Sequence, residues 1–237
     1  MLNSIAKDRN KKSVVAAAFN RTATRILGAL VLVVGLAGCS TGENYHTSVY
    51  LLLDTSGTYT NELDEAKRII NYYLATLKAG DSLAVARIDS GSFSEKDIVA
   101  KVTFDDRPSR ANVQKREFVA VMDNFVQTVE SAAFTDISGG LLQAQEFVRE
   151  TGAGQKHILI FSDLKEELPK GYTREFDLEL DGFFVTALNV TKLRSDNRDP
   201  NEYQDRLSFW QNRVEKAGGN WRIANDLDRE GALDLAE

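Results

Sequence analysis

The stretch Ser48-Val-Tyr-Leu-Leu-Leu-Asp54-Thr-Ser56-Gly-Thr58 places an apolar run directly before an acid, hydroxyl side chains and a glycine. Residues 48–53 include a single polar member, which predicts a strand buried on both faces of a parallel sheet. Asp54, Ser56 and Thr58 then follow the carboxyl end of the strand, the edge at which open α/β sheets bind ligands. Three small oxygen-bearing side chains at that edge indicate a site for a hard cation.

The amino-terminal part of the chain has the pattern of an export signal, and we do not expect it to belong to the folded domain. Residues 1–25 carry six basic side chains and one acid, and the apolar segment that follows is shorter than the roughly 20 residues of a spanning helix. Leu36-Ala37-Gly38-Cys39 resembles the bacterial lipobox, in which the cysteine is lipidated. We therefore expect a lipoprotein signal peptide over residues 1–38, a lipid on Cys39 and a tether over residues 39–46. An ordinary cysteine or an uncleaved anchor is the alternative.

The lipobox implies attachment to the bacterial cell envelope. Ser40, which follows the cysteine, is not the aspartate associated with retention in the inner membrane. We therefore expect an outer-membrane lipoprotein whose domain faces the periplasm or the cell surface.

Composition excludes several classes of function. Removing residues 1–38 changes the net charge from −6 to −11, and such an acidic body is unsuited to nucleic acid or anionic lipid. The remaining 199 residues suffice for one domain, expected over residues 47–237. With His46 and His157 as the only histidines, a Cys/His zinc site is not expected. Neither histidine stands in a Ser/His/Asp or Cys/His pattern, so hydrolysis by such a group is not expected either.

Strand-like and helix-like segments alternate along the chain. Strands are expected over residues 48–53, 81–89, 97–104, 156–163, 182–190 and 221–224, and helices from Asn61 and Pro108 and over residues 141–150, 201–217 and 227–235. A short turn-rich connection makes the second and third strands antiparallel. Residues 172–181 fit neither pattern. The fold class is therefore α/β, with a mainly parallel doubly wound sheet, one antiparallel edge strand and helices on both faces.

Further oxygen ligands lie on two other segments. Asp163 ends a second buried strand, and Thr135 stands in the loop before a helix. Because loops after parallel strands meet at one edge of the sheet, both can join Asp54, Ser56 and Thr58. The sequence thus predicts five metal ligands from three segments.

This pattern resembles the metal-ion-dependent adhesion site (MIDAS) of von Willebrand factor type A (VWA) domains, a Rossmann-like family. The resemblance extends over essentially all of residues 47–237. It implies Mg²⁺, or another divalent cation such as Mn²⁺, whose coordination is completed by an Asp or Glu carboxylate of a protein partner. It also implies that the position of Thr135 changes with the state of the domain, and that the domain binds rather than catalyses.

The chain departs from the family pattern in three places. Thr58 stands where serine is commoner, Asp163 is followed by Leu164 rather than glycine, and Thr135 follows Ala-Phe rather than glycines. These departures affect the expected affinity and loop mobility more than the site itself. Asp136 is expected to cap the next helix with Ser138 rather than to bind metal.

Two other functions remain open from the sequence. The first is a structural lipoprotein that packs in an envelope assembly without metal, in which Tyr203, Trp210 and Trp221 would mark a contact surface, although their spacing favours core packing. The second is an Asp-dependent phosphohydrolase, because a strand ending in Asp-Thr resembles the haloacid-dehalogenase phosphatases. That chemistry needs a second acid two residues after Asp54, where Ser56 stands instead.

Overall fold

A computed structural model describes residues 45–89, 95–229 and 231–235, without the side chains of residues 58, 60 and 61. The expected signal peptide, Cys39, most of the tether and the connection at residues 90–94 lie outside this part. No helix within the described residues is long and apolar enough to cross a membrane.

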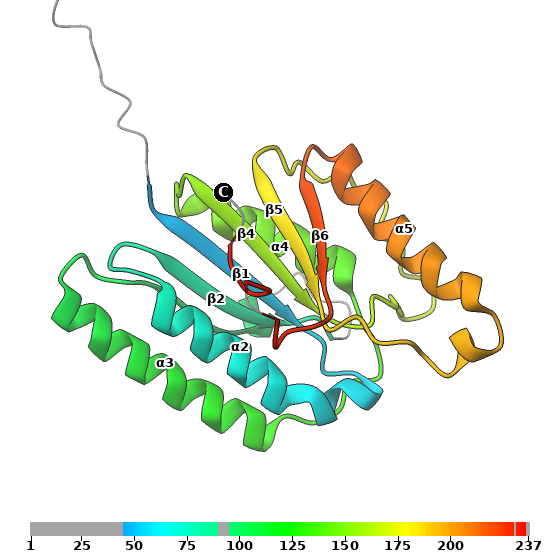
Figure 1. Cartoon of the computed structure of the whole chain (residues 1–237), viewed down its shortest axis with the longest axis horizontal. Coiled ribbons are helices and arrows are strands. Elements are labelled where there is room, and N and C mark those ends of the chain that lie inside the picture. Colours follow the sequence, from blue (N-terminus) through cyan, green and yellow to red (C-terminus); the bar gives the residue numbers. More distant parts are fainter. Residues whose placement is uncertain (1–44, 90–94, 230, 236–237) are drawn as a thin grey trace, which may run out of the picture. The chain divides into compact units, whose positions relative to one another are not determined.

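The described chain is built on a six-stranded sheet in the order β3-β2-β1-β4-β5-β6 (Figure 1). The strands are β1 (Thr47–Leu53), β2 (Ser82–Arg87), β3 (Ile98–Thr103), β4 (Gln155–Phe161), β5 (Phe183–Leu188) and β6 (Asn220–Ala224). Every neighbouring pair is parallel except β2 and β3, which are antiparallel. The α/β fold, with a mainly parallel sheet and one antiparallel edge strand, is confirmed.

Helices cover both faces of the sheet, as expected for a doubly wound fold. They are α2 (Leu63–Thr76), α3 (Pro108–Thr128), α4 (Ile137–Glu150) and α5 (Pro200–Lys216), with short 3-10 turns η1 (Gly57–Glu62), η2 (Glu95–Asp97) and η3 (Ser195–Asn197). Helices α2 and α3 pack on one face and α4 and α5 on the other (Figure 1).

Strand β1 lies at the centre of both cores. Val49, Leu51 and Leu53 pack in the core shared with α2 and α3, whereas Tyr50 and Leu52 pack in the core shared with α4 and α5. All five are at most 1% exposed. Alternate side chains of a strand point to opposite faces, so a strand covered on both sides must be apolar throughout.

Three sequence expectations need correction. The first helix begins at Leu63 after the turn η1 instead of at Asn61, and α4 begins at Ile137, four residues before the expected start. Residues 227–235 do not form the expected closing helix in their described part, because Gly231 has a φ of 76°. That segment is instead held by long-range contacts, such as the hydrogen bond from the Tyr73 hydroxyl to the Leu233 carbonyl (2.9 Å).

Residues 162–182 connect β4 to β5 without a helix or strand, and we call them the strap. Leu178 and Leu180 of the strap are buried in the core shared with α4 and α5. The strap therefore packs against the domain as a helix or strand would. The unassigned segment 172–181 belongs to it. Trp210 of α5 is 1% exposed, which confirms the expectation of core packing for that residue.

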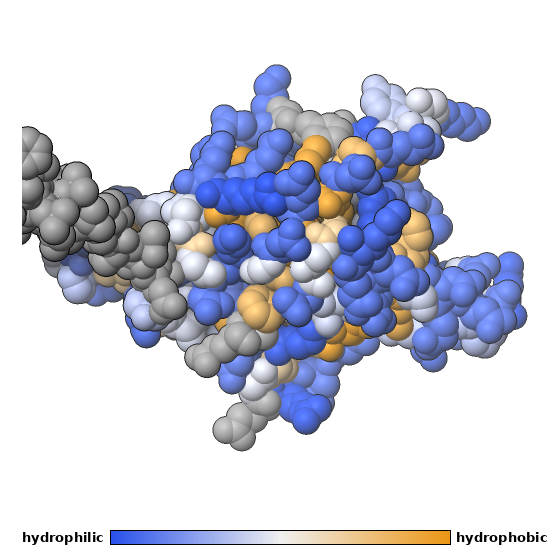
Figure 2. Space-filling view, turned by 90° about the horizontal axis from the view of Figure 1, so that it is seen from above, coloured by the Kyte–Doolittle hydropathy of each residue, from blue (hydrophilic) through white to orange (hydrophobic). Residues whose placement is uncertain are grey.

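The surface seen in Figure 2 is mainly hydrophilic, with hydrophobic residues scattered among charged and polar ones. Among the described residues, the large hydrophobic side chains that are exposed are Tyr45, Val121, Tyr172 and Phe209. Single exposed apolar residues are ordinary on a soluble domain. Whether one of these side chains marks a binding surface therefore depends on the residues around it, and not on how many such side chains are exposed.

A buried histidine makes the stability of the fold depend on pH. His157 of β4 is 2% exposed and stacks on Phe184 of β5, with ring centroids 5.2 Å apart. Burial, assisted by the nearby positive charge of Arg222, lowers the pKa of His157 to about 4. The unfolded chain binds this proton near pH 6.5, so the folded state loses stability as the pH falls from 6.5 towards 4.

We expect wild type to lose about 2.5 kcal/mol of unfolding free energy through His157 between pH 7 and pH 4.5. A His157→Phe variant keeps an aromatic ring against Phe184 but has no proton to bind. Urea denaturation of both proteins at the two pH values measures the difference. Equal losses in the two proteins would contradict the prediction.

Candidate metal centre

The predicted ligands gather at the carboxyl edge of the sheet. Asp54 directly follows β1 and Asp163 follows β4, the parallel neighbour of β1. Thr135 lies before α4, and its hydroxyl is 3.5 Å from Asp54 Oδ1. Ser56 occupies the position just before the turn η1, and Thr58 lies inside that turn with its side chain outside the described part. The structure thus brings together Asp54, Thr135 and Asp163, with Ser56 two residues along the same loop.

Asp54 is held in one orientation by hydrogen bonds to both of its oxygens. Oδ1 accepts the backbone N–H of Ser56 at 2.8 Å, and Oδ2 accepts the hydroxyl of Ser162 at 2.7 Å. Ser162 is fully buried, and its hydroxyl also accepts the N–H of Leu164 at 3.1 Å. Ser162 was not among the residues expected from the sequence, although its place directly before Asp163 was a usable signal. Ser162 links the two acidic loops.

Burial raises the pKa of both carboxyl groups. For Asp54, desolvation outweighs the hydrogen bonds from Ser162, Ser56 and Thr135, which lower the pKa. For Asp163, desolvation again dominates; the charge of Asp54 also raises the pKa, whereas the N–H of Lys165 and the positive charges of Arg206 and Lys165 lower it. Two neighbouring carboxylates, 1% and 9% exposed, therefore disfavour each other's charge unless a cation joins them.

Three other buried acids at this edge, Asp89, Asp136 and Asp196, are each paired with an arginine. The shortest N–O distances are 2.9 Å for Arg87–Asp89, 2.6 Å for Arg174–Asp136 and 2.8 Å for Arg206–Asp196. Among the residues that the structure describes, no lysine, arginine or histidine forms such an ion pair with Asp54 or Asp163. Buried charges are ordinarily paired or bound to metal, so these two fit a cation.

Backbone pairing fixes the position of Thr135. Its N–H donates to the Glu167 carbonyl at 2.8 Å, and the Glu167 N–H donates back to the Thr135 carbonyl at 2.9 Å. On the other side, the Asp136 N–H donates to the Ile88 carbonyl, just beyond β2, at 2.9 Å. The loop before α4 is therefore fastened both to β2 and to the strap.

The start of α4 approaches the sheet closely because Gly140 has no side chain, and Gly139 leaves room for the Asp136 carboxylate that caps the helix. A Cβ atom on Gly140 would lie 2.6 Å from Ile88 and 3.0 Å from Leu52. The carboxylate of Asp136 caps the helix by accepting the Gly139 N–H at 2.8 Å. The expected capping role of Asp136 is confirmed. Both of its carboxylate oxygens also accept hydrogen bonds from Arg174.

Glu166 of the strap also binds the start of α4. Its two carboxylate oxygens accept the backbone N–H of Ser138 at 2.7 Å and the Ser138 hydroxyl at 3.1 Å. Ser138 therefore does not itself cap the helix as expected alongside Asp136; it is a donor to Glu166. A carboxylate at a helix amino terminus is stabilised by the helix dipole. This contact fixes the loop that begins at Asp163.

The donor set suits a small hard cation. Among the described residues, no three His, Cys, Asp or Glu side chains gather as metal ligands. A cation at this edge would therefore use two carboxylates together with the hydroxyls of Ser56, Thr58 and Thr135. Mg²⁺ prefers oxygen donors in octahedral geometry and retains part of its water shell, which agrees with so small a set of acids.

No protein-family model matches the sequence, and no curated protein matches it. Solved structures with a similar fold include the pilus adhesin SpaC from Lactobacillus rhamnosus GG in an open conformation, with a TM-score of 0.48 and 12% identity over 79% of this chain. The chain spans only 28% of that adhesin.

Two further structures are similar in the same sense. The conserved hypothetical protein BatB from Bacteroides thetaiotaomicron has a TM-score of 0.43 and 14% identity, covering 79% of this chain and 93% of BatB. A von Willebrand factor type A structure from Catenulispora acidiphila has a TM-score of 0.42 and 13% identity, covering 80% of this chain and 40% of that one. These likenesses concern the fold alone.

Proposed function

We propose that the chain is a lipid-anchored envelope protein whose VWA-like domain binds a protein partner through Mg²⁺ or a similar divalent cation. The ligands are Asp54, Ser56, Thr58, Thr135 and Asp163. The observation that carries the proposal is the pair of buried carboxylates, Asp54 and Asp163, which form no ion pair among the described residues although three buried acids around them are paired with arginines.

The roles of the ligands follow from their chemistry. The ion supplies an electrophilic centre that can accept one more oxygen from outside the chain. Asp54 and Asp163 supply the negative charge that attracts the cation, directly or through water. Hydroxyl ligands add oxygens without neutralising the ion further, so a carboxylate of an Asp or Glu in a partner is the preferred sixth ligand. This arrangement serves binding.

Anchoring completes the proposal. A lipid on Cys39 and a short tether over residues 39–46 would hold the domain close to a membrane, with the outer membrane favoured. The partner is then another protein at that surface.

Calorimetric titration of the full chain in detergent with MgCl₂ tests the proposal. An Asp163→Ala variant is expected to bind Mg²⁺ about 10–100-fold more weakly than wild type, because it loses half of the carboxylate charge at the site. Asp228→Ala is the matched control, since Asp228 is an exposed acid paired with Arg68. A wild type whose titration shows neither released nor absorbed heat of binding, or an Asp163→Ala variant that titrates like wild type, would contradict the proposal. The first result would favour the metal-free structural role.

A further inference from the structure

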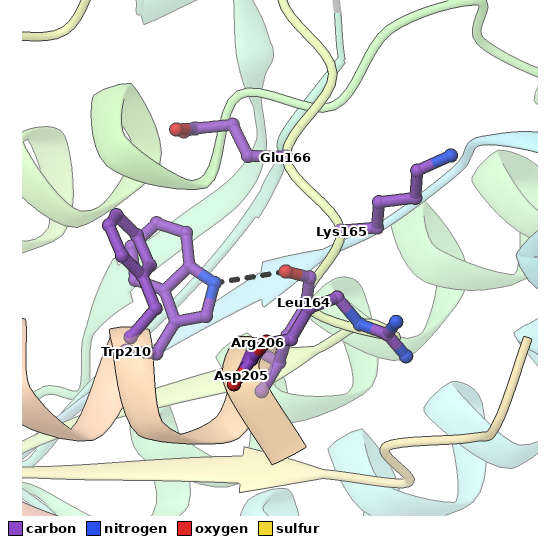
Figure 3. A pocket seen from close by; sticks show the side chains of 7 residues that line it. Leu164, Lys165, Glu166, Asp205, Arg206 and Trp210 are labelled. Atoms are coloured by element: carbon purple, nitrogen blue, oxygen red, sulfur yellow. Dashed lines mark hydrogen bonds between the residues drawn. The ribbon is translucent and has the colours of Figure 1, made fainter. Parts of the chain in front are cut away.

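A cleft opens directly beside the candidate metal centre. It is lined by the strap residues that follow Asp163, Leu164–Glu166, and by the α5 side chains Asp205, Arg206, Phe209 and Trp210 (Figure 3). Its volume is about 290 Å³. Leu164 lines the cleft and is the next residue after Asp163, a proposed metal ligand. The Cα atoms of these two residues are therefore about 3.8 Å apart.

The cleft has an apolar floor and one exposed aromatic wall. Leu164 and Trp210 form the floor, each 1% exposed, and the Trp210 indole N–H donates to the Leu164 carbonyl at 2.9 Å (Figure 3). The ring of Phe209 stands edge-on to Trp210, with centroids 5.1 Å apart, and remains 52% exposed. A half-exposed phenylalanine over a buried tryptophan is an anchoring surface for another apolar group.

Arg206 joins this cleft to the loop of Asp163. Its guanidinium makes a two-pronged contact with Asp196 at 2.8 and 2.9 Å, and its Nε donates to the Asp163 carbonyl at 3.2 Å. These hydrogen bonds fix α5 against the loop of Asp163. The separation between the cleft and the Asp163 carboxylate is therefore constant. Leu164 lies in the left-handed region, with a φ of 65°; its N–H donates to the Ser162 hydroxyl and its carbonyl accepts the Trp210 indole N–H.

The size of the cleft indicates its occupant. Its volume lies at the lower end of the roughly 300–1,000 Å³ of pockets that hold small molecules, and it has room for a single large side chain. An extended segment advances about 3.3 Å per residue, so a residue one or two positions from a metal-bound carboxylate reaches an adjacent cleft. Four lining residues are charged (Lys165, Glu166, Asp205 and Arg206), but the surface formed by Leu164, Phe209 and Trp210 favours contact with an aromatic side chain.

We propose that the cleft receives an aromatic side chain of the partner, from the same extended segment whose Asp or Glu carboxylate completes the metal site. This inference rests on the proposed function and deepens it, because it specifies an acidic residue with an aromatic neighbour as the feature that the partner must present. Phe209 is the residue that determines the specificity.

The probe is a set of short synthetic peptides with one central Glu and with Phe or Ser at each of the two positions on either side. Binding of each peptide to the full chain is measured by fluorescence anisotropy at saturating Mg²⁺. We expect Phe at one of these positions to tighten binding about tenfold relative to Ser, as a buried aromatic anchor does.

A Phe209→Ser variant is expected to lose this preference, so that its affinity for the Phe peptide falls to that for the Ser peptide. Val121→Ser is the matched control, because Val121 is 46% exposed on α3, away from the cleft. Neither variant should change the calorimetric affinity for Mg²⁺ alone. That readout separates damage to the metal centre from loss of the cleft.

Equal affinity for Phe and Ser peptides, unchanged preference in Phe209→Ser, or no binding of any peptide to the Mg²⁺-loaded chain would each overturn this inference and leave the metal centre standing. Absence of Mg²⁺ binding in the titration without peptide would instead overturn the proposed function, and the inference with it.

Discussion

An Asp54→Asn variant is expected to be more stable than wild type in EDTA and to gain no stability from Mg²⁺. Burial raises the pKa of Asp54, so the folded state without a cation disfavours its charge at neutral pH. Asparagine removes the charge while keeping an oxygen for the Ser56 N–H and a group that can bond the Ser162 hydroxyl. The folded state without metal is therefore relieved of an unfavourable charge.

Wild type, unlike the variant, is expected to gain unfolding free energy when Mg²⁺ is added. A cation that binds only the folded state adds about 2.7 kcal/mol at a concentration 100 times its dissociation constant, and the variant should gain none of this. Denaturant unfolding of both proteins, in EDTA and in Mg²⁺, gives the four required free energies. A purely structural role for Asp54 predicts the reverse in EDTA, namely a variant that is less stable than wild type, and that result would refute the prediction.

Replacing Arg174 by methionine is expected to lower the unfolding free energy by about 3–5 kcal/mol, because it leaves a buried charge without its partner. The guanidinium is 9% exposed and bonds the Asp136 carboxylate through Nε, at 3.1 and 3.0 Å, and through Nη2, at 2.6 Å. The same carboxylate caps α4. The loss therefore falls on the helix that follows Thr135.

A double-mutant cycle tests whether the unpaired Asp136 charge causes the loss of stability. Adding Asp136→Asn to Arg174→Met removes the stranded charge but retains a capping side chain for Gly139, so a substantial part of the loss should be recovered. Arg149→Met is the matched control, because Arg149 of α4 makes an exposed ion pair with Glu179 of the strap and its loss should cost less than about 1 kcal/mol. A double variant no more stable than Arg174→Met would show that the ion pair is not the source.

The strap and the candidate centre are connected through these residues. Arg174, Glu166 and Glu167 all bond the segment from Thr135 to Ser138. The resemblance to VWA domains implies a threonine whose position changes, whereas in this chain the backbone of Thr135 is paired on both sides. We therefore expect a Thr135 loop with little freedom to move.

The local pattern of the sequence was sufficient for the architecture. Residues 48–53 form a strand buried on both faces because a central parallel strand must be apolar throughout, and the short link after residue 89 made β2 and β3 antiparallel. Periodicity failed where long-range contacts decide the backbone. Residues 227–235 have an apolar pattern, yet Gly231 and the contacts of Tyr73 and Arg222 with this segment keep its described part from closing into a helix.

By itself, the sequence determined where the acids and hydroxyls stand, because Asp54 and Asp163 each end an apolar run and strand ends can be recognised locally. Only the tertiary structure decided which acids are already neutralised. Arg174 is 38 residues from Asp136, and Ser162 is 108 residues from Asp54, so packing alone brings each pair together. Charge pairing depends on distance in space, which spacing along the chain does not encode. Asp54 and Asp163 form no ion pair among the described residues, and the proposed cation site rests on that observation.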